Sequence, residues 1–131
     1  MFAVKAGSED TGGVFSLLEV VVGHDVPLHI HHNDDEVVYM LEGEMEATFD
    51  GRVYAVKPGD FLLLPRGVPH AIHPTSDVPP RLLQVSSPGG FEHFIEDVAA
   101  GMGGGSLNDF SPDAVQEITD KHGITFLPPR S

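Results

Sequence analysis

The amino-acid sequence predicts an all-β fold, a barrel or sandwich of short strands, followed by a helical segment. Apolar and β-branched runs of four to nine residues recur through the first two thirds of the chain, and turn residues separate them. After Pro88 the apolar residues follow the spacing of a helix instead. We therefore expect one domain over residues 1–131, with the barrel at about 14–88 and helices at 89–131.

Seven strands are expected, and they cover residues 14–22, 36–41, 44–49, 52–57, 61–64, 68–73 and 81–86. The clearest is 44–49, where apolar and polar residues alternate strictly, as in a strand with one buried face. Asp50 and Gly51 follow it and predict a tight hairpin into the next strand. Short strands joined by such turns are typical of a sandwich or barrel.

Two helices are expected to cover this barrel. The first has one apolar stripe at helical spacing, which consists of Phe91, Phe94, Ile95 and Val98. After a flexible, glycine-rich segment at 101–106, Ser111 is placed to cap a second helix that begins at Pro112 and ends at Gly123. Residues 124–127 then form a short apolar strand that packs back onto the body.

Composition argues against several partners and several kinds of site. Seven Lys and Arg stand against 20 Asp and Glu, and the formal charge of −13 disfavours nucleic acid and anionic membranes. Because the chain has no Cys, it has no disulfide, thiolate nucleophile or iron–sulfur site. The first ten residues lack the apolar run of a signal peptide, and no run is long enough to span a bilayer. We expect a cytoplasmic protein.

Three histidines and one glutamate form the candidate metal site. On an extended strand residues two apart point the same way, so His29 and His31 place two imidazoles on one face, roughly 6.5 to 7 Å apart. Glu36 opens the next expected strand and can return a carboxylate toward the same point, and His70 begins another. Imidazole and carboxylate suit divalent transition metals. We expect one divalent ion bound by these four side chains.

These positions resemble the two sequence motifs of the cupin family. The first motif, GX(5)HXHX(3,4)EX(6)G, is matched at every spacing by Gly23, His29, His31, Glu36 and Gly43. The second, GX(5)PXGX(2)HX(3)N, is matched by Gly59, Pro65, Gly67 and His70. Its final Asn is replaced by Pro74, which affects the local turn and not a ligand. The resemblance implies a double-stranded β-helix, or jelly-roll barrel, with C-terminal helices packed on it.

The resemblance also implies a homodimer. In cupins the N-terminal strands often add to the sheet of a neighbouring subunit, and Phe2, Val4 and the apolar run from Val14 are placed to do so here. Such pairing would cover an exposed sheet edge.

Three runs narrow the resemblance, namely PLHIHHNDDEVVYMLEGE, LPRGVPHAI and PGGFEHFIEDV. They are similar to the small single-domain cupins grouped with quercetin 2,3-dioxygenase. This implies a dioxygenase that uses O2 and iron, manganese, nickel or cobalt. His29, His31 and His70 would hold the metal, and Glu36 would be both ligand and catalytic base for the 3-hydroxyl of a flavonol.

Two alternatives stay open. One is a non-redox cyclase or isomerase of natural-product biosynthesis, in which Zn²⁺ polarises a carbonyl. The other is a cupin that binds a small molecule without catalysis, as in sensor domains of regulators. Against that second alternative, residues 89–131 contain no helix-turn-helix segment and no basic patch.

The expected substrate is a planar aromatic or polyketide-like small molecule. By alternation along their strands, Val38 and Met40 share a face with Glu36, and Ile72 shares one with His70, so these three side chains should line an apolar pocket beside the metal. A phosphorylated substrate would call for cations. The barrel offers few, mostly near turns: Arg52, Lys57, Arg66 and Arg81.

The remaining candidates receive plainer interpretations. Asp35 is a rival ligand, but it should point to the face opposite Glu36. His32 and His73 lie one residue out of phase with the ligands and should be surface groups or supports behind them. The ordinary solvated role is expected for His24, His93 and His122. Core packing is expected for Phe91 and Phe94, in preference to a place in a substrate pocket.

Overall fold

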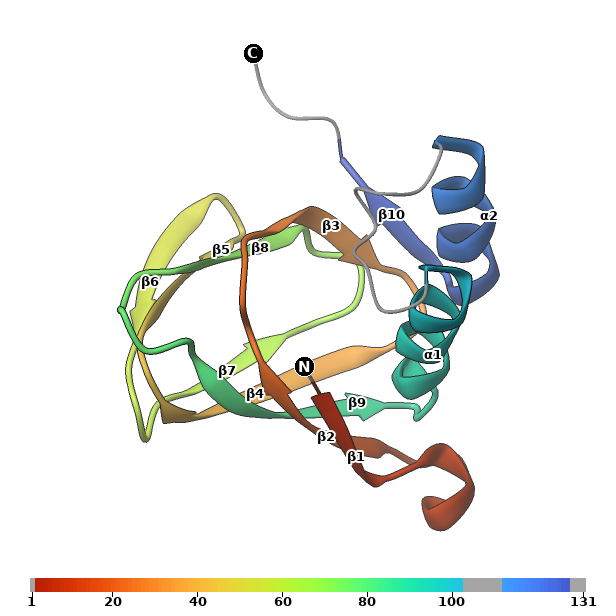
Figure 1. The fold of residues 1–131 in the computed structure, drawn as a ribbon, viewed down its shortest axis with the longest axis horizontal. Coiled ribbons are helices and arrows are strands. Elements are labelled where there is room, and N and C mark those ends of the chain that lie inside the picture. Colours follow the sequence, from red (N-terminus) through yellow and green to blue (C-terminus); the bar gives the residue numbers. More distant parts are fainter. Residues whose placement is uncertain (1, 103–111, 128–131) are drawn as a thin grey trace.

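The computed structural model describes residues 2–102 and 112–127, and its strands form two five-stranded antiparallel sheets that close into a barrel (Figure 1). The first sheet has the order β1-β2-β9-β4-β7 and comprises Phe2–Ala6, Ser16–Val21, Arg81–Ser87, Asp35–Glu42 and Phe61–Leu64. The second has the order β10-β3-β8-β5-β6 and comprises Ile124–Phe126, Val26–His31, His70–Pro74, Met45–Phe49 and Arg52–Val56. The all-β prediction is confirmed, and each of the seven expected strands is present.

The N-terminal strand forms the edge of the first sheet. Phe2 and Val4 of β1 pair with Val20 and Leu18 of β2. A 3-10 helix, η1 (Ser8–Thr11), joins the two strands. The homodimer stays a prediction.

One end of the barrel interior is a closed apolar core. Its buried members are Val22, Val38, Met40, Met45, Ala47, Val56, Leu64 and Leu82. They meet because side chains alternate along each strand, so that one face of every strand turns inward. Gly43 ends β4 with φ +76°. A Cβ atom there would lie 2.9 Å from Pro80 Cα, so this turn requires glycine.

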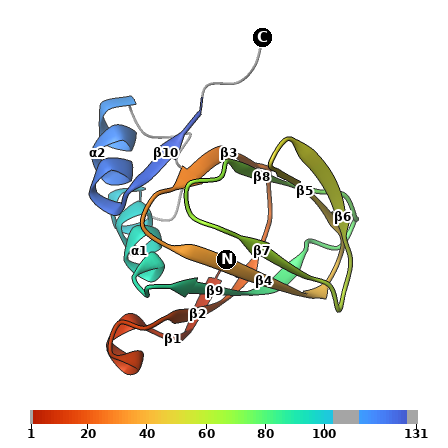
Figure 2. The ribbon, with the colours of Figure 1, turned by 180° about the vertical axis from the view of Figure 1, so that it is seen from behind.

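The other end of the barrel is covered by two helices and β10 (Figure 2). These helices are α1 (Phe91–Met102) and α2 (Pro112–His122), and both were expected. α1 continues through Gly101 and Met102, where the sequence suggested a flexible segment; the rest of that segment, 103–106, and the cap Ser111 lie outside the described residues. No helix within 2–102 and 112–127 has the length and apolar character to cross a membrane.

Candidate metal centre

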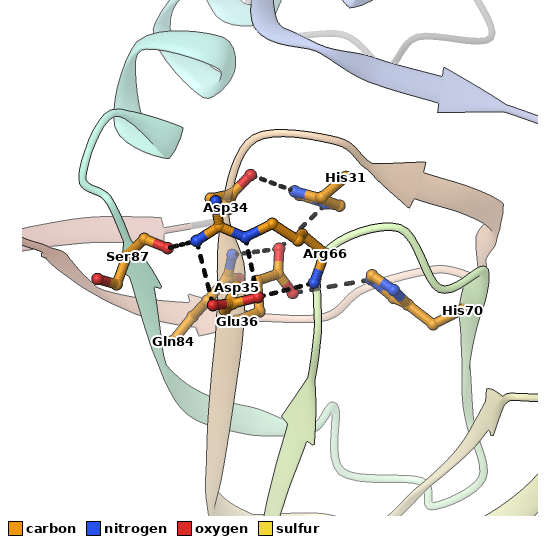
Figure 3. A network of polar contacts seen from close by, with 8 residues as sticks. All are labelled: His31, Asp34, Asp35, Glu36, Arg66, His70, Gln84 and Ser87. Atoms are coloured by element: carbon orange, nitrogen blue, oxygen red, sulfur yellow. Dashed lines mark hydrogen bonds and ion pairs between the residues drawn. The ribbon is translucent and has the colours of Figure 1, made fainter.

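The four predicted ligands come together inside the barrel, at the end nearest to α1. His29 and His31 lie on β3, Glu36 is the second residue of β4, and His70 opens β8 opposite His29. One imidazole nitrogen from each of the three histidines lies within 4.8 Å of the other two. Glu36 Oε1 is 3.1 Å from His31 Nε2, and Glu36 Oε2 is 3.8 Å from His70 Nε2 (Figure 3). None of the four residues is more than 6% exposed.

The turn between β7 and β8 delivers His70 to this cluster. Gly67 N–H donates to the His31 carbonyl oxygen at 2.8 Å, which fixes the turn against β3. Next to it, the backbone N–H and the guanidinium of Arg66 both donate to the Asp35 carboxylate, at 2.8 to 3.3 Å (Figure 3). The Gly67 hydrogen bond connects the turn to β3, and the Arg66 contacts connect it to the start of β4.

Hydrogen bonds behind the ligands orient them. His29 Nδ1–H donates to the Pro27 carbonyl oxygen at 2.7 Å. His31 Nδ1–H donates to Asp34 Oδ1 at 3.1 Å, and Gln84 Nε2 donates to Glu36 Oε1 at 3.0 Å. Because both Nδ1 atoms are donors, the Nε2 atoms of these histidines carry the lone pairs that a metal needs.

Asp34 and Gln84 were missed in the sequence analysis, although each left a signal. Asp34 lies three residues after His31, close enough for its carboxylate to reach back to the ring. Gln84 is a polar residue within the apolar strand β9, at a position that the structure leaves only 8% exposed. A buried polar side chain in an apolar strand calls for a partner, and here that partner is Glu36.

The electrostatics of the cluster suit a bound cation. Burial lowers the pKa of His29 to about 4. Burial, together with the neighbouring imidazoles, lowers the pKa of His70 to about 3, so both rings are neutral near pH 7. Burial also raises the pKa of Glu36 to about 7. No Lys or Arg of the described segments is buried near this carboxylate.

His31 differs from the other two ligand histidines. Burial by itself lowers its pKa, but the hydrogen bond to Asp34 and the charges of Glu36 and Asp34 raise it above the ordinary value. Together, three imidazoles and a carboxylate with no Lys or Arg of the described segments buried beside it form a donor set that fits a divalent metal ion.

An apolar cavity of about 480 Å³ opens beside the imidazoles. His29 and His31 form part of its wall, and α1, α2, β10 and the start of β3 supply most of the rest, including Val26, Ile95, Val98, Val115 and Phe126. The Phe126 ring is stacked on His29 with the centroids 5.2 Å apart, and the Phe91 ring lies 5.3 Å from that of His31. The wall next to the ligands is therefore aromatic.

This cavity is not the one expected from strand alternation. Val38 and Met40 do face the barrel interior, but they are 4% and 0% exposed and belong to the apolar core; Ile72 packs against that core. None of the three lines the 480 Å³ cavity, and their contact with substrate stays a prediction. Phe91 and Phe94, both expected to pack in the core, also form part of the cavity wall, and Phe94 is 8% exposed.

The other candidates are resolved by their surroundings. Asp35 points outward and is bound to Arg66, as its position out of phase with Glu36 predicted. His24, His32 and His73 are exposed, and His93 is partly exposed. His122 is a correction: its side chain is only 14% exposed, and its Nε2–H donates to Asp97 Oδ2 at 2.6 Å.

The cations near the barrel agree with the expectation that a phosphorylated substrate is disfavoured. Arg52, Lys57 and Arg66 are exposed. Arg81 is half-buried, and its guanidinium contacts Glu19 and Glu42. None of these four side chains lines the 480 Å³ cavity.

Comparisons with known proteins agree with this geometry. The cupin domain family matches residues 16–86. Quercetin 2,3-dioxygenase of Bacillus subtilis (strain 168) is 37% identical over 70 residues, which are 52% of this chain and 21% of that enzyme. The tetracenomycin polyketide synthase protein TcmJ of Streptomyces glaucescens is 28% identical over 78 residues, 60% of this chain and 52% of that protein. The chain thus spans less than two thirds of either relative.

A solved structure supports the fold itself. KdgF from Halomonas sp. superposes with a TM-score of 0.61 at 17% identity, over 70% of this chain and 81% of that one. At that identity the likeness bears on the fold alone, and it agrees with the all-β barrel described above.

Proposed function

The chain belongs to the cupin domain family, and on this premise we propose that it is a metal-dependent enzyme acting on a small planar aromatic or polyketide-like substrate, most closely a dioxygenase of the quercetinase kind. One observation carries the proposal. The buried set of three imidazoles and one carboxylate adjoins an apolar cavity, whose wall includes two of those imidazoles, His29 and His31, and the rings of Phe91 and Phe126. Flat aromatic molecules suit such a wall, since aromatic rings stack on one another.

The residues of the site have two roles in this proposal, metal binding and proton transfer. His29, His31, His70 and Glu36 would hold the metal, which is iron, manganese, nickel or cobalt in this proposal. When bound, such an ion supplies acidity to a coordinated hydroxyl and redox capacity toward O2. Glu36 takes the proton from the 3-hydroxyl of a flavonol, and the hydrogen bond from Gln84 holds that carboxylate in place.

The cavity orients the substrate and excludes water from it. Phe91 and Phe126 position the ring system of the substrate against the imidazole edges. Apolar side chains of α1 and α2 exclude water from the remainder of the bound molecule. The exposed or carboxylate-bound cations of the barrel leave the cavity without a counter-charge for an anionic substrate.

Oxygen uptake tests the proposal. Apo-protein is loaded separately with iron(II), manganese(II), nickel(II), cobalt(II) and zinc, confirmed to bind one ion per chain, and given quercetin. We expect uptake with at least one redox metal, none with zinc, and none in His70→Ala. His73→Ala, which changes an exposed histidine on the same strand, is the matched control. Turnover at an undiminished rate without O2 would overturn the dioxygenase.

The similarity to TcmJ, a polyketide synthase protein, supports a second candidate. In it the same cavity binds a polyketide-like substrate, and a zinc ion polarises a carbonyl for cyclisation or isomerisation without O2. If no metal supports oxygen uptake and the purified protein contains zinc, the result would favour this second candidate over the dioxygenase.

A further inference from the structure

The first sheet is apolar on its outer side as well as on its inner side. On β2, β9, β4 and β7 the residues that alternate with the buried ones point away from the barrel interior. In the middle of the sheet these residues form two rows that cross the four strands in register. Seven of the eight side chains in the rows are apolar and are called the outer apolar face: Leu17, Val37, Tyr39, Phe61, Leu63, Leu83 and Val85. The eighth is Glu19.

The outer apolar face is open to solvent in the single chain. Phe61, Leu63 and Tyr39 are 66%, 49% and 44% exposed, and the other four side chains are half-buried. Both ribbon views show α1 and α2 beside the barrel, near β10, and neither of these two helices lies over β4 or β7 (Figure 1, Figure 2). Monomeric proteins seldom leave large contiguous apolar patches uncovered, and such a patch marks a site of interaction.

The second sheet differs, because its outer face is mixed in the way that a solvated sheet requires. In one outer row Glu46 stands opposite His73, and in the next Thr48 stands opposite Ala71. Val53 of β6 lies beside Thr48 in that second row. An antiparallel sheet with one face in water places polar residues on that face. The first sheet departs from this rule, so we expect a further layer of protein on its outer side.

Charges at the border of the outer apolar face largely cancel, although the whole chain carries a formal charge of −13. At one end of the strands Arg81 contacts Glu19 and Glu42. At the other end the Arg66 guanidinium is bound to the Asp35 carboxylate. Two acidic chains repel each other, and the repulsion is small where cations offset the carboxylates. A second copy of this chain can therefore approach this side of the barrel.

The first sheet also has the size that a stable contact needs. Five strands about 4.8 Å apart make it roughly 24 Å wide, and the eight residues of β4, at about 3.4 Å each, make it roughly 27 Å long. This outline of roughly 650 Å² is comparable with the 800 Å² or so that each partner buries in a standard interface. The outer apolar face would be the centre of the interface and the charged border its polar rim.

We propose that two copies of the chain pack their outer apolar faces together, sheet on sheet, about a two-fold axis. Such a contact uses the same patch on both copies, and a patch that is apolar at its centre and balanced in charge at its border is complementary to itself. Sheets that pack face to face lie about 10 Å apart and interdigitate their side chains. This contact would form the predicted homodimer without adding an N-terminal strand to a neighbour's sheet. It is independent of the proposed function, because no metal or substrate takes part.

Light scattering coupled to size-exclusion chromatography of the full chain tests the proposal. We expect the mass of two chains for the unaltered protein and the mass of one chain for Phe61→Glu, because a carboxylate inside an apolar interface has no partner. Val53→Glu is the matched control and should keep the two-chain mass, since Val53 is 62% exposed on the outer face of the second sheet. A one-chain mass for the unaltered protein at every concentration would overturn the proposal, and so would a two-chain mass for folded Phe61→Glu.

Nitration of tyrosine by tetranitromethane tests the same contact in the unaltered chain, so the result does not depend on a variant that folds. The chain has two tyrosines of similar exposure, Tyr39 at 44% in the outer apolar face and Tyr54 at 39% on β6. At the concentration of the scattering measurement we expect nitration of Tyr54 and loss of nitration at Tyr39. Equal nitration of the two rings would overturn the proposal, whatever the mass of the protein.

Discussion

The two parts of β4 line the same barrel interior and have different neighbours. At the start of β4, the Glu36 carboxylate lies next to the polar side chains of His31, His70 and Gln84. Further along the same face, Val38 and Met40 pack only into the apolar core. Strand alternation gives all three residues the same direction, and all three pair with β9, so what separates them is the side chains that each one meets inside the barrel. The barrel interior therefore has a polar end around Glu36, where a metal could bind, and an apolar end around Val38 and Met40, whose packing stabilises the fold.

If this division holds, the largest effect on metal binding should come from the polar end. His70→Ala removes one of four ligands and should weaken metal affinity by more than about 100-fold, because lost ligands cost more than lost supports. A chelator competition measures it. His73→Ala, on the same strand but exposed, should keep its affinity. Equal metal affinities in the two variants would contradict a metal site at the polar end of the barrel.

Met40→Ala is the complementary change at the apolar end. Met40 is fully buried, so its truncation should lower the free energy of unfolding by about 2–5 kcal/mol, the usual cost of a cavity in a core. Chemical denaturation of the metal-free protein measures it. Tyr39→Ala, at the neighbouring position on the outer face, should cost less because that ring is 44% exposed. Loss of metal affinity in folded Met40→Ala would show that the two ends are coupled.

Gln84→Ala tests whether a residue between the polar and apolar ends contributes to metal binding. This residue lies next to the core on β9, yet its amide serves Glu36. We expect metal affinity to fall by about 10–100-fold, as for other groups that orient a ligand from behind. Gln116→Ala, on the exposed side of α2, is the control for the competition titration. Unchanged affinity would mean that Glu36 keeps its orientation without Gln84.

The smallest effect is expected where the helices meet over the polar end. Asp97 Oδ2 accepts hydrogen bonds from His122 and Lys121, and the first of these does most to lower the pKa of Asp97 below its ordinary 3.8. A lowered carboxyl pKa stabilises the fold above pH 3.8, and this stabilisation is lost as the pH falls through the folded-state value.

Asp97→Asn should therefore be less stable than the original protein near pH 7. The difference should disappear in strong acid, where both side chains are uncharged. Denaturation at a series of pH values measures the effect, with Asp113→Asn on the exposed first turn of α2 as the control. A difference that persists unchanged in acid would contradict a role for the charge of Asp97.

The sequence by itself predicted the barrel, most of its strands and the four candidate ligand positions that the structure brings together. Local rules suffice for these features, because alternation places His29 and His31 on one face and turn residues set where Glu36 and His70 begin their strands. It also placed Asp35 outside the site, since adjacent strand residues point to opposite faces.

Only the tertiary structure decided what surrounds the ligands. Alternation gives a direction but not a neighbour: Val38 and Met40 face the interior as expected and belong to the core, and their contact with substrate stays a prediction. The Gln84 amide and the Phe91 and Phe126 rings reach the site region from elements distant in sequence. Such contacts depend on how the sheets close and where the helices dock, which no local pattern encodes.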